Sequence, residues 1–110
     1  MVVVHVRVPI KPEARERWLE LADAVTGPPR AEDACRSYQM FEAVETPGTF
    51  LFFEEWESID GLYNHFHTAH FTELSGALGD VLAAPPEGWV HELASTRTLD
   101  ETLAAAGIGG

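Results

Sequence analysis

Valine occupies every even position of residues 2–8, and His5 and Arg7 stand between these valines. The two-residue period, built from β-branched side chains, predicts a strand whose even valines share one face. Apolar residues then recur at helical spacing and predict a helix over residues 12–26. Gly27 is the expected helix stop, and the GPPRAED composition that starts there indicates a loop.

Three further strands are predicted. Residues 34–44 and 49–57 are rich in strand-forming residues, and the ETPG between them is typical of a hairpin loop. The run Phe50–Phe53 is apolar on both alternating faces, so this strand should be covered on both sides. A last strand is expected over residues 88–99, followed by a short tail or a last helical turn over 100–110.

A second helical region is predicted over residues 59–83. Ser58 is a suitable N-cap for its start, and Thr68 can cap a continuation. The region is therefore either one kinked helix or two segments that meet near residues 67–69.

The predicted order is β-α-β-β-α-β, the ferredoxin-like arrangement of the α+β class. It has an antiparallel sheet with both helices on one face. The predicted domain spans residues 1–99, and residues 100–110 form the tail. The other face of the sheet would be left bare, so we expect a homodimer through the sheet face, since two-fold pairing is the commonest way to cover such a surface.

Composition narrows the choice of partners. The 110-residue chain has 18 Asp and Glu against 7 Lys and Arg, a formal charge of −11 that disfavours nucleic acid and anionic membrane surfaces. Cys35 is the only cysteine, so neither an internal disulfide nor a thiolate metal cage is expected, and its role stays open. We find no secretory leader pattern and no long apolar run, and expect a cytoplasmic protein.

Three of the five histidines lie close together in the stretch NHFHTAHF. On one continuous helix His70 falls on the apolar side, His65 points away and His67 lies on the flank, so the three would not converge. The i, i+4 spacing of helical metal ligands is absent and no acidic residue is an obvious third ligand, so no metal site is expected. His70 is then either a core histidine bonded to a carbonyl or carboxylate, or a catalytic group.

Strand 49–57 carries an acidic residue among aromatic ones. Phe50, Phe52, Glu54 and Trp56 share one of its faces. A carboxyl group in such surroundings needs a partner, either for structural pairing or for handling protons.

These residues resemble the pattern of one known family. The pattern is an E-x-W on a strand, a Ser-capped helix, a histidine, and His-Phe five residues later: Glu54, Trp56, Ser58, His65, His70 and Phe71. The chain resembles the antibiotic biosynthesis monooxygenase family over nearly its whole length. The resemblance implies a dimeric α+β barrel with a pocket between sheet and helices, and no metal or other cofactor. It also implies the oxidation of a small phenolic, quinol or polyketide-type aromatic molecule with molecular oxygen.

The resemblance also suggests roles for individual side chains. The expected catalytic residues are His70, as base or substrate hydrogen-bonder, with Asn64 and Trp56. The expected substrate-binding residues are Tyr38, Phe52, Glu54, Tyr63, His65 and Phe66.

Three alternatives stay open. The domain could be a non-catalytic ligand-binding or accessory protein, or an isomerase or cyclase that uses acid–base chemistry alone. A related branch degrades haem with an asparagine on strand one, a tryptophan on strand three and a histidine on helix two. The first strand here has no asparagine, which argues against haem.

Overall fold

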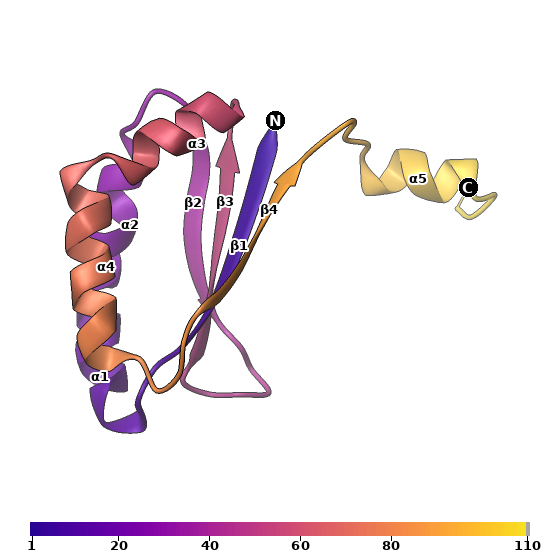
Figure 1. The fold of residues 1–110 in the computed structure, drawn as a ribbon. Coiled ribbons are helices and arrows are strands. Elements are labelled where there is room, and N and C mark those ends of the chain that lie inside the picture. The colour runs from indigo at the N-terminus through magenta and orange to yellow at the C-terminus, as the bar shows by residue number, and fades with distance from the viewer. Residues whose placement is uncertain (110) are drawn as a thin grey trace.

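The computed structural model describes residues 1–109 and contains the predicted ferredoxin-like fold (Figure 1). Its elements are β1 (Val2–Pro9), η1 (Pro12–Ala14), α1 (Arg15–Glu20), α2 (Ala22–Arg30), β2 (Cys35–Glu42), β3 (Thr49–Trp56), α3 (Ile59–Phe66), α4 (Ala69–Val81), β4 (Glu87–Glu92) and α5 (Leu99–Ala105). The four strands form an antiparallel sheet in the order β2-β3-β1-β4. Helices α1, α2 and α4 lie along one face of this sheet (Figure 1). The predicted fold class is therefore confirmed.

The core lies between that face and the helices. The even valines of β1 face it, as predicted, and Val2, Val4 and Val8 are buried. Trp18 of α1 is fully buried and packs its ring edge-on against Phe50 and Phe52 of β3, with centroid distances of 6.4 and 6.2 Å. Aromatic burial of this kind anchors the first helical segment to the middle of the sheet.

The first helical segment differs from its prediction. It breaks at Leu21, and α2 continues through Gly27 and two prolines to Arg30, so the predicted helix stop and loop are wrong. Prolines lack an amide hydrogen but keep their carbonyl oxygens. The carbonyls of Pro28 and Pro29 accept hydrogen bonds from the amides three residues later, those of Ala31 and Glu32, at 3.1 and 3.0 Å. The helix thus ends at Arg30, and Glu32 lies two residues beyond this end.

The second helical region is divided in two, which was one of the two predicted alternatives. Ser58 accepts a hydrogen bond from the Gly61 amide and caps α3, and Thr68 accepts one from the Phe71 amide and caps α4. Both predicted caps are confirmed. The break at His67 and Thr68 resets the helical phase between the two segments.

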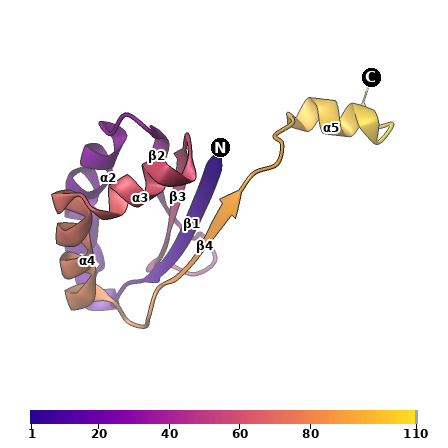
Figure 2. The ribbon, with the colours of Figure 1, turned by 45° about the horizontal axis from the view of Figure 1, so that its top comes forward.

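The C-terminal part departs from the sheet. Strand β4 ends at Glu92, earlier than the predicted end at residue 99, and all six of its residues are exposed. Helix α5 begins with a capping box between Thr98 and Glu101 and lies apart from the sheet in both views (Figures 1 and 2). Among residues 1–109, no helix has the length and apolar character needed to cross a membrane.

A glycine pair gives a test of this packing. A Cβ at Gly61, in the first turn of α3, would overlap the Cβ of Ala34, whereas a Cβ at Gly76 of α4 would meet open space. Gly61→Ala should lower the free energy of unfolding by about 1–3 kcal/mol through overpacking. Gly76→Ala should raise it by up to about 1 kcal/mol, because alanine favours the helix. Urea denaturation of both variants checks this, and equal effects would contradict the close contact between α3 and Ala34.

Candidate active site

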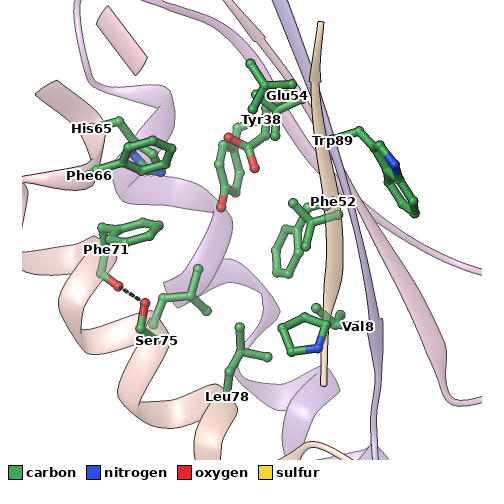
Figure 3. A pocket seen from close by; sticks show the side chains of 16 residues that line it. Val8, Tyr38, Phe52, Glu54, His65, Phe66, Phe71, Ser75, Leu78 and Trp89 are labelled. Carbon is green, nitrogen blue, oxygen red and sulfur yellow. Dashed lines mark hydrogen bonds between the residues drawn. The ribbon is translucent and has the colours of Figure 1, made fainter. Parts of the chain in front are cut away.

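A cavity of about 280 Å³ lies between the sheet and the helices (Figure 3). Its walls come from β1, β2, β3, α3, α4 and β4, and most of them are apolar. The lining residues are Val4, Val6, Val8, Tyr38, Phe52, Glu54, His65, Phe66, Phe71, Leu74, Ser75, Leu78, Pro86, Gly88, Trp89 and Val90. An apolar cavity with a few convergent polar groups is the usual form of a small-molecule site.

Glu54 is the carboxyl group of this cavity. It lies on the helix-facing side of β3 and is only 5% exposed. Its Oε1 accepts a hydrogen bond of 3.0 Å from the indole Nε1 of Trp56. Burial raises the pKa of Glu54 to about 7; the Trp56 bond works against this shift, and the nearby charge of Glu32 adds to it. Glu54 can therefore both give and take a proton near neutral pH.

Tyr38 stands beside Glu54, since the two residues are partners across β2 and β3. It is 2% exposed, and its hydroxyl oxygen points toward the cavity (Figure 3). Burial raises the pKa of Tyr38, and the charge of Glu54 raises it further, so the hydroxyl keeps its proton. It offers the cavity a neutral hydrogen-bond donor.

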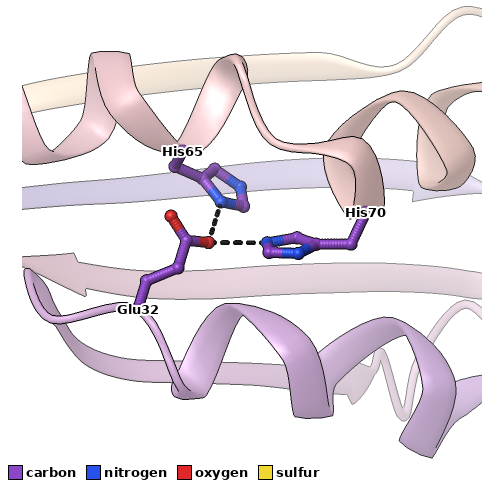
Figure 4. Close-up of side chains that lie close together, drawn as sticks. All are labelled: Glu32, His65 and His70. Carbon is purple, nitrogen blue, oxygen red and sulfur yellow. Dashed lines mark hydrogen bonds and ion pairs between the residues drawn. The ribbon is translucent and has the colours of Figure 1, made fainter.

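His65 and His70 meet at the carboxylate of Glu32 (Figure 4). The Nδ1 of His65 lies 2.6 Å from Oε2 of Glu32, and the Nε2 of His70 lies 2.7 Å from the same oxygen. The prediction that His65 points away is wrong, because this residue is only 1% exposed. The histidines converge because the break at Thr68 resets the helical phase. The missing acidic partner is Glu32, which the sequence did not reveal.

The surroundings of His65 define the state of its ring. The ring packs against Trp56 at a centroid distance of 4.6 Å and against Tyr38 at 5.8 Å. Burial lowers the pKa of His65, and the hydrogen bond to Glu32 opposes that shift only in part. The neutral imidazole therefore donates its Nδ1 hydrogen to Glu32, and the carboxylate assigns the tautomer. Nε2 is left as the nitrogen that can accept a hydrogen bond from a ligand in the cavity.

The structure separates the predicted site residues into three groups. Tyr38, Phe52, Glu54, His65 and Phe66 line the cavity. Trp56 is fully buried and contacts the cavity residue Glu54 without lining the cavity itself. His70 faces a smaller hollow between α2 and α4. Tyr63 and Asn64 are exposed residues of α3 that do not line the cavity.

Two features of the site were missed at the level of the sequence. Phe71, Leu74 and Leu78 form one wall, and their three- and four-residue spacing on α4 could have identified it. No spacing or motif in the sequence marks Glu32 as a site residue. It lies 33 residues from His65 along the chain and reaches the histidines only through the tertiary fold.

Comparison with known proteins identifies the family of this chain. Residues 1–76 match the sequence model of the family described as Antibiotic biosynthesis monooxygenase. The chain belongs to this family. The predicted resemblance is thereby confirmed, and with it the ferredoxin-like fold that the solved family structures share.

Individual members of the family show the extent of the similarity. The chain is 35% identical over 98 residues to the uncharacterized protein sll1783 of Synechocystis, covering 89% of this chain and 67% of that protein. It is 33% identical over 85 residues to a Bacillus subtilis protein named "Putative monooxygenase YcnE", covering 77% of this chain and 90% of the other. The solved structure of Rv0793 from Mycobacterium tuberculosis superposes with a TM-score of 0.80 at 31% identity, covering 88% of this chain and 98% of that one.

The buried carboxyl of Glu54 should make stability depend on pH. Its pKa is about 7 in the fold against an ordinary 4.5, so between these values the folded protein holds a proton that the unfolded chain has lost. The contribution of Glu54 to the free energy of unfolding should therefore fall as the pH rises from about 4.5 to about 7, by roughly 2–3 kcal/mol. Glu54→Gln should remove this fall, while Glu55→Gln, on the other face of β3, should keep it. Urea denaturation at a series of pH values measures the difference, and identical profiles for wild type and Glu54→Gln would contradict the assignment.

Proposed function

We propose that this family member is a monooxygenase that oxidises a small phenolic, quinol or polyketide-type aromatic molecule with molecular oxygen and needs no cofactor for the reaction. The supporting observation is the Glu54 carboxyl group, which lies in an apolar cavity with its pKa raised to about 7. A general base is most effective when its pKa lies near the working pH. An acidic aromatic hydroxyl is the proton donor that matches this base and these walls.

The proposed reaction is balanced without an external reductant. A phenol with a free ring C–H reacts with one O₂ to give a quinone and one water. Glu54 takes the proton of the hydroxyl group, and the resulting phenolate is electron-rich enough to reduce oxygen. One oxygen atom becomes the new carbonyl, and the other leaves as water with the two hydrogens of the substrate. The protein's contribution is to bind, orient and desolvate the phenolate.

The other polar groups act on the same substrate. The Tyr38 hydroxyl donates a hydrogen bond to the oxygen on which the negative charge collects, and the Nε2 of His65 accepts one from a second hydroxyl of the substrate. Trp56 positions Glu54 through its indole hydrogen bond. His70 acts on His65 through Glu32 and is a positioning residue here. Tyr63 and Asn64 have no part in this proposal, because they are exposed on α3 and do not line the cavity.

We also propose that two chains pair through the bare face of the sheet. This face exposes Phe41 and Trp89, which are 51% and 41% exposed in the single chain, and the Trp89 ring points away from the cavity (Figure 3). The ring of His5 stacks on Trp89 and on His91, and the guanidinium of Arg7 lies 5.9 Å from the Trp89 ring centroid. Aromatic and arginine side chains are the types enriched in protein interfaces.

Oxygen uptake tests the reaction. Purified protein, treated with chelator, is given a panel of hydroquinones and polycyclic phenols in an oxygen electrode. Uptake by the wild type should rise with pH through an apparent pKa near 7, since the base must be deprotonated. Glu54→Gln should lower kcat by about 10²- to 10⁴-fold, the usual contribution of a general base. His67→Gln, an exposed histidine of the same region, is the control and should behave as the wild type.

A variant of Trp56 tests whether the pKa of Glu54 sets the pH profile. Trp56→Phe removes the hydrogen bond that holds the pKa of Glu54 down, so its pH profile should shift to higher pH while the plateau rate changes less. Wild-type protein that binds these aromatics saturably but consumes no oxygen would overturn the proposed reaction. The protein would then be a non-catalytic ligand-binding protein. If it converts the bound aromatic molecule without oxygen, it would be an isomerase or cyclase.

Sedimentation velocity tests the pairing. The wild type should sediment with twice the chain mass. Phe41→Lys should raise the dimer dissociation constant at least about tenfold, because a buried unpaired charge costs more than about 1.4 kcal/mol. The matched control is Val44→Lys, which replaces a 94% exposed residue outside the strands and should leave the dimer intact. A wild type that stays monomeric at all concentrations would contradict the proposed interface.

A further inference from the structure

We infer that Glu32, His65 and His70 form a binding site for one divalent transition-metal ion of the Zn²⁺ type. Each residue offers one ligand atom, and the three atoms lie within 4.8 Å of one another. Two imidazole nitrogens with one carboxylate oxygen make a ligand set that suits Zn²⁺, Co²⁺ and related ions. The site is distinct from Glu54 and Tyr38 but shares His65 with the cavity.

Binding an ion requires the carboxylate to withdraw from both nitrogens, while the two nitrogens, which lie within 4.8 Å of each other, approach one ion. Ligand atoms bonded at about 2.1 Å to a tetrahedral ion lie about 3.4 Å apart. Glu32 Oε2 is now 2.6 and 2.7 Å from the two nitrogens, so it would have to withdraw by several tenths of an ångström. Glu32 lies in the turn between α2 and β2, and its side chain is partly exposed to solvent.

The two histidines are held in place for this role. The His65 ring is fixed by Trp56 and by Phe71, with centroid distances of 4.6 and 5.3 Å. Thr68 donates a hydrogen bond of 2.7 Å to the His65 carbonyl, which fixes the break that turns His70 toward Glu32. His65 is thus a fixed ligand, while the partly exposed side chains of His70 and Glu32 adjust to the ion.

Solvent can reach the cluster from one side. The side chains of His70 and Glu32 are 26% and 17% exposed, while that of His65 is 2% exposed. This side gives an ion a route inward and lets solvent water reach it as a fourth ligand. Three protein ligands with one open position are typical of accessible zinc sites.

An ion at this site would change what His65 presents to the cavity. A metal on Nδ1 moves the imidazole hydrogen to Nε2, so the nitrogen facing a ligand becomes a donor instead of an acceptor. If the proposed oxidation is correct, the ion should therefore alter substrate binding. That consequence depends on the proposed function, whereas the binding of the ion does not.

The test measures metal binding directly. Chelator-treated protein is titrated with Zn²⁺ by calorimetry and with Co²⁺ by visible absorption, whose d–d bands report nitrogen and oxygen ligation. One ion per chain should bind. His70→Gln and Glu32→Gln should each weaken binding by more than about 100-fold, since even the loss of an outer-shell partner costs about 10- to 100-fold. Circular dichroism of both variants verifies that they are folded.

Two control variants separate this site from other histidines. His67→Gln removes an exposed histidine next to the cluster, and His5→Gln removes one member of the cross-strand pair in which His91 Nε2 lies 3.1 Å from His5 Nδ1. Both should bind Zn²⁺ as the wild type does. The inference is overturned if the wild type binds no ion at millimolar Zn²⁺, or if binding survives in folded His70→Gln and Glu32→Gln. It is equally overturned if binding is lost in His5→Gln.

Discussion

The Thr68 side chain controls the geometry of the helical wall of the site. Its Oγ1 donates to the carbonyl of His65 and accepts from the amide of Phe71, so one hydroxyl ends α3 and starts α4. The change of phase brings His65 and His70 to one carboxylate although they are five residues apart. It also directs Phe71 and the apolar residues that follow it on α4 toward the sheet, where they close the cavity. A single continuous helix could not do both, because residues five apart on a helix differ by about 140° in direction.

The second constraint is the acid buried on β3. A carboxyl group removed from water favours its neutral form, and the aromatic walls around Glu54 impose this. The Trp56 indole offsets part of the loss by donating a hydrogen bond to the carboxyl oxygen. Burying such a carboxyl group lowers the stability of the fold, and groups of this kind are found mainly at functional sites. The nearby thiol of Cys35, in contrast, stays protonated at neutral pH, because burial raises its pKa to about 11.

The sequence predicted the fold well because its strongest signals were local. Alternation in β1 and the caps at Ser58 and Thr68 depend on a few neighbouring residues, and all appear in the structure. Errors arose where the tertiary fold decides. The GPPRAED composition predicts a loop, but α2 continues through both prolines, whose carbonyls still accept hydrogen bonds. His65 is buried because it shares the face of α3 that carries Gly61 and Leu62, whereas the apolar Tyr63 and Phe66 are exposed. Glu32 could not be found at all, since nothing near it in the sequence marks a residue that meets two distant histidines.

Strand β4 has a consequence for the dynamics of the cavity. It is one of the two edges of the sheet, and among residues 1–109 it pairs with no strand but β1. All six of its residues are exposed, yet Gly88 and Val90 form part of the cavity wall. Edge strands with few buried contacts open at low free energy, while central strands open only with the whole domain. Amide hydrogens of β4 should therefore exchange with solvent much faster than those of β3. The β4 wall of the cavity then opens transiently, while the β3 wall, which carries Glu54, stays in place. A ligand can therefore enter without disturbing the buried acid.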